Sequence, residues 1–174
     1  MNPKKIYIFG TMGSGKTTLA RNLSKKLNLP HYELDDIYWK GKERGKAKRS
    51  DEECKKLLQK LTRKKEWVIE GCFSRWIEPG IKNSQLVIWL DIPFTILIYR
   101  LFFRKLKGNN NEKWTDTLRM IKQSYEYSIL KKSTKENWGH RTRKKQISFI
   151  KKHKIKYLHL KNTKEIRQFM GNLK

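Results

Sequence analysis

Cysteines and long apolar runs are scarce in this sequence. Two of its 174 residues are cysteine, Cys54 and Cys72, too few for a disulfide framework or a cysteine-based metal site. The most apolar stretch, residues 92–103, carries an arginine and falls short of the roughly eighteen residues that a membrane span needs. The first residues also lack the long apolar region and cleavage site of a secretory signal. We therefore expect a reduced, cytoplasmic protein with no membrane partner.

Acidic residues are also few, because 16 aspartates and glutamates stand against 42 lysines and arginines, a formal net charge of +26. The excess is concentrated in residues 100–174, which hold 22 basic and 5 acidic residues, against 20 and 11 in residues 1–99. This charge fits a polyanionic partner such as nucleic acid. A general bias towards solvated lysine explains it equally well, because no helix-turn-helix or zinc finger accompanies it. We expect at most weak, non-specific nucleic-acid binding.

Apolar segments of strand length alternate with amphipathic segments along the chain, which predicts a parallel sheet covered by helices. The length suits a single domain. Polar loops are expected at 40–50 and 107–114. Ser50 and Glu53 form a capping box at the start of one helix. Strands are predicted at 4–9, 31–34, 67–71, 85–91 and 154–160, and helices at 16–28, 50–65, 93–107 and 163–170.

The most specific motif lies between the first predicted strand and the first predicted helix. Gly10, Gly15, Lys16 and Thr17 fit G-x-x-x-x-G-K-[ST], the phosphate-binding loop (P-loop), in its strand-loop-helix context. Glycines let backbone N–H groups curl around a phosphate, and the helix that follows adds its positive end. Lys16 is placed to reach the β- and γ-phosphates and Thr17 to bind Mg²⁺. We expect ATP and Mg²⁺ as cofactors, bound through Gly10, Thr11, Gly13, Ser14, Gly15, Lys16, Thr17 and Thr18.

The rest of the chain resembles a known group of proteins. The P-loop, the acidic pair after the second strand and "WVIEG" resemble the small P-loop kinases, such as adenylate and shikimate kinases. In those kinases a segment similar to "LDIPFTILIYRLFFRKLK" leads into a lid. "LPHYELDDIYWK" and "WVIEGCF" more closely resemble FlaR-type DNA topology modulation proteins, which are adenylate-kinase-like by fold.

The resemblance implies an α/β fold of the three-layer α/β/α P-loop NTPase type. Its five-stranded parallel sheet has the strand order 2-3-1-4-5, and a helical lid covers the site. The whole chain, 1–174, forms one kinase-like domain, with acceptor and lid insertions at approximately 36–65 and 104–143.

Carboxylates are expected at the carboxyl ends of two strands, where parallel sheets collect their ligands. Asp35 and Asp36 end the second strand, and an acid there can orient or deprotonate an acceptor hydroxyl. Asp35 is the first candidate and Asp36 the second; an ordinary helix-capping aspartate is the alternative. Glu70 ends the third strand at the place that the resemblance gives to a Walker-B carboxylate, although relatives usually carry aspartate. We expect Glu70 and Thr17 to hold Mg²⁺.

Arginines complete the predicted site. Arg100 and Arg104 share one helix face, and the resemblance implies that such arginines clamp ATP. Arg100 is predicted to be catalytic, together with Lys16 and Asp35. Acceptor binding is assigned to Arg75 and to the arginines that flank the return of the lid, Arg141 and Arg143, beside Asp35 and Asp36. A basic surface without a ligand is the alternative for each arginine.

Several conspicuous side chains receive no site prediction. Four aromatic residues near the acceptor side either stack on a ring or belong to the core, Cys72 is taken as inert, and the four histidines show no metal spacing. The sequence thus predicts an ATP-dependent kinase for a small acceptor. The alternative is a nucleic-acid-associated ATPase or DNA-binding protein that affects DNA topology. The aromatic residues are Tyr38, Trp39, Phe73 and Trp76.

Overall fold

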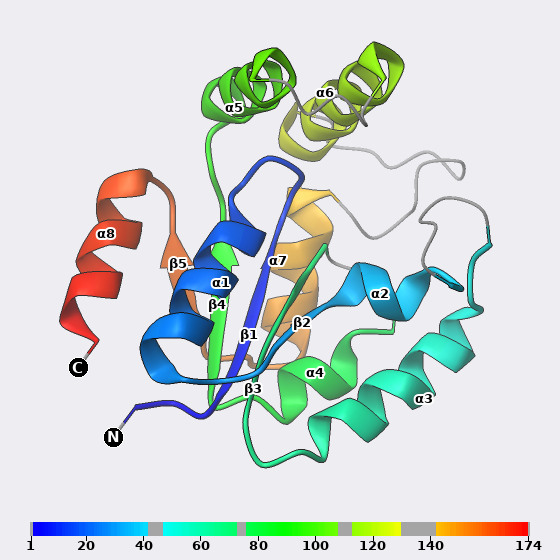
Figure 1. Ribbon diagram of the computed structural model, residues 1–174, viewed down its shortest axis with the longest axis vertical. Coiled ribbons are helices and arrows are strands. Elements are labelled where there is room, and N and C mark those ends of the chain that lie inside the picture. The colour runs from blue at the N-terminus through cyan, green and yellow to red at the C-terminus, as the bar shows by residue number, and fades with distance from the viewer. Residues whose placement is uncertain (1, 42–46, 73–75, 108–112, 130–141, 174) are drawn as a thin grey trace.

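Five parallel strands form one sheet in the order β2-β3-β1-β4-β5 (Figure 1). The computed structural model describes residues 2–41, 47–72, 76–107, 113–129 and 142–173. The parallel sheet and its strand order confirm the fold class predicted from the sequence. The strands are β1 (Lys5–Gly10), β2 (His31–Glu33), β3 (Trp67–Gly71), β4 (Leu86–Leu90) and β5 (Leu158–Leu160).

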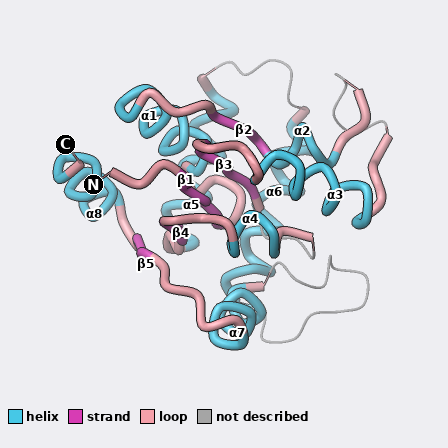
Figure 2. The backbone as a smooth tube through the Cα atoms, turned by 90° about the horizontal axis from the view of Figure 1, so that it is seen from below, coloured by secondary structure: helices cyan, strands magenta, loops and turns pink. Residues whose placement is uncertain are grey.

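Helices cover both faces of the sheet. In Figure 2, α1 and α8 lie on one side of the strands and α3, α4 and α7 on the other. The helices are α1 (Lys16–Leu27), α2 (Leu34–Tyr38), α3 (Asp51–Thr62), α4 (Glu78–Lys82), α5 (Phe94–Leu106), α6 (Trp114–Ile129), α7 (Arg143–Lys152) and α8 (Thr163–Asn172).

Each face of the sheet has its own apolar core, and β1 contributes to both. Tyr7 and Phe9 point to the core formed with α3, α4 and α7, whereas Ile6 and Ile8 point to the core formed with α1, α5 and α8. These four side chains have no exposed surface. Because parallel strands are covered on both faces, they read as continuous apolar runs in the sequence.

The boundaries of most predicted elements are confirmed. The capping box is present at the start of α3, where Ser50 Oγ accepts from the Glu53 N–H at 3.1 Å and Glu53 Oε2 accepts from the Ser50 N–H at 2.7 Å. Three strands are shorter than predicted: β2 ends at Glu33, before the helix α2, β4 spans Leu86–Leu90 instead of 85–91, and β5 begins only at Leu158.

Four helices were not predicted: α2 and α4, of five residues each, and the longer α6 and α7. The inner faces of α6 and α7 carry buried polar side chains, Thr117 and Ser124 on α6 and Gln146 on α7, each at most 1% exposed. These polar residues interrupt the apolar repeat by which an amphipathic helix is found in a sequence.

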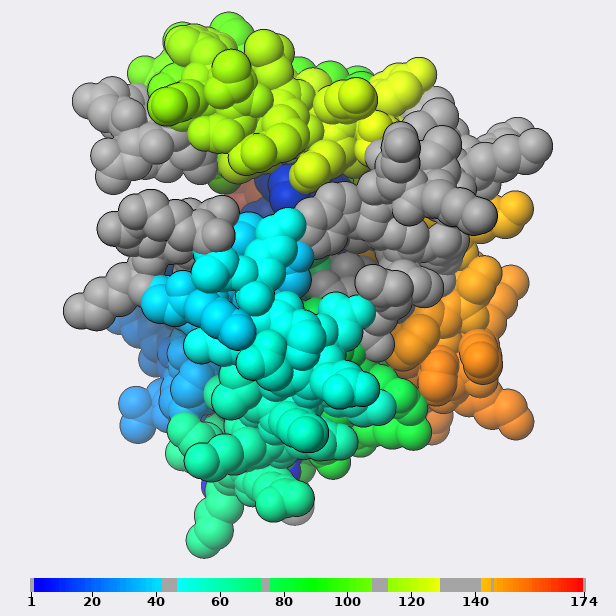
Figure 3. All heavy atoms as spheres, turned by 90° about the vertical axis from the view of Figure 1, so that its right-hand side faces the viewer, coloured from blue at the N-terminus to red at the C-terminus, as the bar shows by residue number. Residues whose placement is uncertain are grey.

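Helices α5 and α6 pack against each other beyond the carboxyl ends of the strands, over the loop that follows β1 (Figure 1). Seen from the side, α6 lies above α2 and α3, and atoms of the N-terminal segment are visible between them (Figure 3). Within the described residues, no helix combines the length and apolar character that crossing a bilayer demands.

Candidate active site

The loop from β1 to α1 has the backbone shape that its glycines predict. Gly13 and Gly15 adopt φ angles of 77° and 92°, in the left-handed region that favours glycine. Lys16 is only 8% exposed, and its Nζ donates to the carbonyl oxygen of Thr11 at 2.9 Å. The ammonium group thus lies inside the curve of its own loop, where a bound phosphate would meet it.

Thr17 and Glu70, the two predicted metal ligands, lie together. Thr17 Oγ1 donates to Glu70 Oε1 at 2.7 Å, because pairing of β1 with β3 places Glu70 beside Ile8. Glu70 is 4% exposed, and this burial raises the pKa of its carboxyl, with the Lys16 charge acting in the opposite direction. A hydroxyl and a carboxylate at this separation are ligands of the type that Mg²⁺ prefers.

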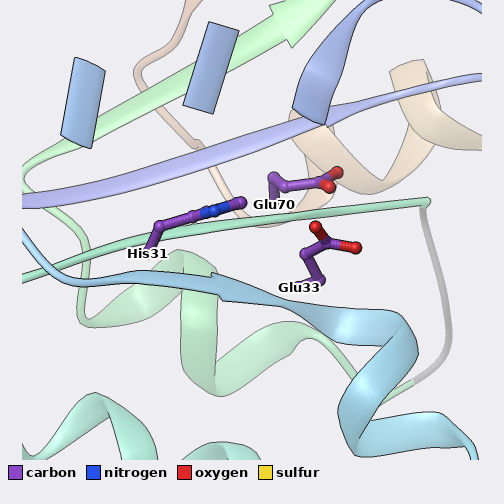
Figure 4. Close-up of side chains that lie close together, drawn as sticks. All are labelled: His31, Glu33 and Glu70. Carbon is purple, nitrogen blue, oxygen red and sulfur yellow. The ribbon is translucent and has the colours of Figure 1, made fainter. Parts of the chain in front are cut away.

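A second carboxylate and a histidine adjoin Glu70 on the neighbouring strand. The ligand atoms of His31, Glu33 and Glu70 all lie within 4.8 Å of one another (Figure 4). Glu33 is the register partner of Glu70, and its Oε1 lies 3.2 Å from Arg21 Nη2. His31 Nε2 is buried and makes no hydrogen bond within the described residues. These three side chains can hold a divalent cation.

The spacing of residues in the sequence did not predict this cluster. The histidines showed no metal pattern because His31 and Glu33 reach Glu70 only through the pairing of β2 with β3, across more than thirty residues of chain. The signal that could have found them is the predicted sheet order, since it makes the second and third strands neighbours and aligns their carboxyl ends.

The prediction that Asp35 and Asp36 end the second strand is wrong. Glu33 is the last strand residue, and both aspartates lie exposed in the first turn of α2. Negative side chains are favourable at a helix N-terminus, which explains why the helix starts here. Asp35 is still near enough to the site for its negative charge to add to burial in raising the pKa of Glu70. A role of either aspartate in acceptor binding stays a prediction.

Arg100 of α5 contacts the P-loop directly. Its Nη1 donates to the carbonyl oxygen of Ser14 at 2.9 Å and its Nη2 to Thr163 Oγ1 at 3.0 Å, and burial lowers its pKa. Arg104, one turn further along the helix, places Nη2 3.0 Å from the sulfur of Met120 on α6. The structure therefore brings Arg100 to the loop and Arg104 to the α5–α6 interface.

Arg143 takes part in a polar network at the end of β4. Its Nε and Nη2 lie 2.9 and 2.8 Å from Asp91 Oδ2, which is also 2.9 Å from Nε2 of His159. Tyr127 donates its hydroxyl to the same carboxylate at 3.4 Å. Sequence reasoning missed Asp91, His159 and Tyr127, which come from three separate elements. The predicted residues Arg75 and Arg141 lie outside the described residues.

The aromatic residues near the site divide between core and surface. Trp76 is 4% exposed and Tyr38 packs against the same core, so the core interpretation holds for both. Trp39 stands edge-on to Tyr38, with ring centroids 4.9 Å apart. Cys72 is half-buried, and Phe73 lies outside the described residues.

Comparisons with known proteins agree with this geometry. Residues 6–117 match the family described as "AAA domain". The chain is 36% identical over 110 residues to the uncharacterized protein YqaC of Bacillus subtilis, with 63% of this chain and 61% of that protein covered. It is 31% identical over 113 residues to a shikimate kinase of Rhodopirellula baltica, with 58% and 60% covered. The matches thus span about three fifths of the length of these relatives.

A solved structure shows the same fold over nearly the whole chain. The shikimate kinase of Bacteroides thetaiotaomicron superposes with a TM-score of 0.55 at 20% identity, covering 98% of this chain and 95% of the other. The three-layer arrangement with a P-loop after the first strand is therefore a P-loop NTPase fold that this chain shares with that structure.

Proposed function

This chain belongs to the AAA domain family, and we propose that it is an ATP-dependent phosphotransferase that moves the γ-phosphate of ATP to a small acceptor. The observation that carries the proposal is the pairing of an intact P-loop with the Thr17–Glu70 contact of 2.7 Å. A phosphate cradle with a hydroxyl and a carboxylate beside it is the arrangement that phosphoryl transfer needs.

The proposed roles follow from charge and position. Lys16 and the backbone N–H groups of the loop hold the phosphates, and Arg100, which donates to the carbonyl oxygen of Ser14, supports the shape of that cradle. Mg²⁺ held by Thr17 and Glu70 would neutralise phosphate charge. Asp35, on the first turn of α2, orients or deprotonates the acceptor hydroxyl.

The class of acceptor is inferred from the relatives. Proteins named shikimate kinase are among the curated relatives and solved structures that this chain resembles. We therefore infer a small hydroxyl compound or a nucleotide as the acceptor. The closer resemblance to FlaR-type proteins stays a prediction. The nucleic-acid-associated ATPase rests on the net charge and on that resemblance, whereas the P-loop and its neighbouring side chains support phosphoryl transfer, so we do not favour it.

The test is ATP turnover in the presence of a panel of small hydroxyl compounds, shikimate included, and nucleoside monophosphates. One acceptor should raise turnover above the basal rate, and Lys16→Ala should abolish that increase, because charge stabilisation of the transferred group is worth several kcal/mol, on the order of 100-fold or more in rate. Lys25→Ala, an exposed lysine in the last turn of the same helix, is the matched control and should behave as wild type. Wild-type turnover by Lys16→Ala would refute the proposed site.

A second variant separates the acceptor side from the ATP side. Asp35→Asn should lower acceptor-dependent turnover while the affinity for ATP stays nearly unchanged, since Asp35 lies on α2 and not in the P-loop. An equal loss of ATP affinity would show that Asp35 serves the metal or the fold instead. ATP affinity is measured by titration calorimetry and turnover by coupled assay.

A further inference from the structure

Helices α5 and α6 expose a row of large apolar side chains on the side away from the sheet. On α5 these residues recur at i, i+3, i+4 and i+7, so they form one stripe along the helix. On α6 two further members are spaced at i and i+4. This outer face consists of Tyr99 (60% exposed), Phe102 (44%), Phe103 (38%), Leu106 (56%), Trp114 (49%) and Leu118 (61%).

The opposite side of α5 is apolar as well. Leu97 and Leu101 are at most 1% exposed, and a Cβ atom placed on Gly13 of the P-loop would lie 3.1 Å from Leu101 Cγ. A surface helix normally carries one apolar stripe, which faces the core. The inner stripe of α5 has its partner within the chain, whereas the outer stripe faces solvent, and a large exposed apolar patch marks an interaction site.

Ring contacts join the outer face into one patch. Tyr99 and Phe103 have centroids 4.2 Å apart, and the Phe102 and Trp114 rings join α5 to α6 at 6.1 Å. Lys105 Nζ lies 5.8 Å from the centre of the Trp114 ring. The apolar side chains are thus gathered together, with a cation at their border.

Positive charge is abundant on the two helices that carry this patch. Apart from Arg100, whose guanidinium is held at the P-loop on the inner side of α5, the described residues of 99–107 and 113–129 include six basic side chains and two acids, Asp116 and Glu126. Asp116 is already paired with Arg119 at 2.7 Å. An anionic partner therefore complements this region. The six basic residues are Arg104, Lys105, Lys107, Lys113, Arg119 and Lys122.

We propose that the outer face binds the surface of an anionic lipid bilayer. Leucine and phenylalanine side chains enter the boundary between headgroups and acyl chains, tryptophan and tyrosine take the interfacial level, and lysine and arginine reach the lipid phosphates. No helix of the described residues is suited to span a membrane. Attachment to a membrane surface needs only an apolar face flanked by cations. The proposal therefore departs from the sequence-based expectation of no membrane partner.

A second copy of this chain is a poorer partner for the same face. A two-fold symmetric dimer would pack this surface against itself and bring six basic side chains towards six others. Like charges at such an interface repel. The formal net charge of +26 on each copy adds to that repulsion.

Single-stranded nucleic acid also fits less well. Base stacking requires open aromatic faces, but the rings here pack on one another, and Leu106 and Leu118 offer no flat face. The exposed aliphatic side chains of Leu106 and Leu118 suit the hydrocarbon of a bilayer, so we favour lipid.

Co-sedimentation with vesicles tests the proposal on the full-length protein. We expect binding to phosphatidylcholine vesicles that contain phosphatidylglycerol, little binding to phosphatidylcholine alone, and weaker binding as salt screens the charges. The double variant Phe102→Ser/Leu106→Ser should bind about tenfold more weakly, because it removes two inserted side chains. Leu57→Ser, a change of an exposed leucine on α3 (41% exposed), is the matched control and should bind as wild type.

Thermal unfolding of each variant confirms that it is folded before its binding is compared. Failure of the wild type to bind anionic vesicles overturns the proposal. So does equal binding by the double variant, since attraction would then come from general charge. A dimer in sedimentation velocity, or binding of a single-stranded oligonucleotide without vesicle binding, with either lost in the double variant, would assign the face to that partner instead.

Discussion

At the scale of single residues, the buried carboxyl of Glu70 makes the stability of the fold depend on pH. Burial raises the pKa of Glu70 above its ordinary value of 4.5. As pH rises above about 4.5, the unfolded chain loses this proton first, so the free energy of unfolding falls until the higher folded pKa is passed. Relative to wild type, Glu70→Gln should therefore gain stability as pH increases from 4 upwards, by about 1.4 kcal/mol per unit of pKa difference. Urea unfolding at a series of pH values measures it.

Glu78 supplies a control of opposite sign. A hydrogen bond from Lys82 lowers its pKa, and the two side chains lie 2.7 Å apart. The Glu78–Lys82 pair stabilises the fold at pH values above the pKa of Glu78 in the unfolded chain, and this stabilisation is lost as pH falls. Glu78→Gln should therefore lower the free energy of unfolding by a few tenths of a kcal/mol at neutral pH and leave it unchanged in acid. A Glu70→Gln profile parallel to that of Glu78→Gln would contradict the raised pKa of Glu70.

The residues of the site differ in how far the sequence could reveal them. Gly15, Lys16 and Thr17 are adjacent in the chain. The geometry of the loop between strand and helix fixes their spacing in the sequence, so a motif can identify them. His31, Glu33 and Glu70 meet only across two strands, so no spacing exists to be found. Asp91 and Arg143 likewise come together from β4 and α7, and their pairing depends on how an unpredicted helix packs.

At the scale of elements, the contact between β3 and α2 can be tested at Gly71. A Cβ atom at this position would lie 2.6–2.7 Å from side-chain atoms of Leu34, the first residue of α2. Gly71→Ala should therefore destabilise the fold by about 1–3 kcal/mol, since the core has no space for the methyl group. Chemical denaturation measures the loss.

A double variant makes the steric cause specific. Leu34 is 3% exposed, so Leu34→Ala alone should cost about 2–5 kcal/mol. Combined with Gly71→Ala it should cost less than the sum of the two single changes, because Leu34→Ala removes Cγ and Cδ1, two of the three atoms that crowd the new methyl group, while Cβ stays. Simple additivity would show that the two residues do not interact.

Elements with strong local signals were found in the sequence, and elements that depend on tertiary packing were not. Helix α3 has its cap in Ser50 and Glu53, and β1, β3 and β4 are continuous apolar runs. Helix α2 is five residues long and directly follows β2. It is too short to show an apolar repeat, and no turn residue marks the end of the strand before it. Helices α6 and α7 bury polar side chains, which removes the apolar period that prediction uses.

At the scale of the whole molecule, the formal net charge of +26 should make stability depend on salt. Repulsion among so many positive groups opposes the compact state, and the screening length falls from about 30 Å at 0.01 M to about 8 Å at 0.15 M. We expect the thermal midpoint to rise by about 2–4 °C over this range, equivalent to about 1 kcal/mol. Differential scanning calorimetry in sodium chloride measures it.

A variant with less charge provides the comparison. Lys144, Lys151 and Lys152 are exposed on α7, and changing all three to glutamine lowers the net charge by three. The response of its midpoint to salt should be smaller than that of wild type. A midpoint that is insensitive to salt in both proteins would mean that the charges are too far apart to act on stability.

The central position of β1 in the sheet has a consequence for synthesis on the ribosome. Both neighbours of this strand, β3 and β4, are made later, and Leu90 at the end of β4 follows Gly10 by 80 residues. At about 5–20 residues per second, some 4–16 s pass before the second neighbour exists. Until Gly71 completes β3, 61 residues after Gly10, the apolar segment 6–9 has no strand to pair with, and until Leu90 is made one of its edges stays unpaired. The nascent chain therefore presents this segment as a binding site for a chaperone.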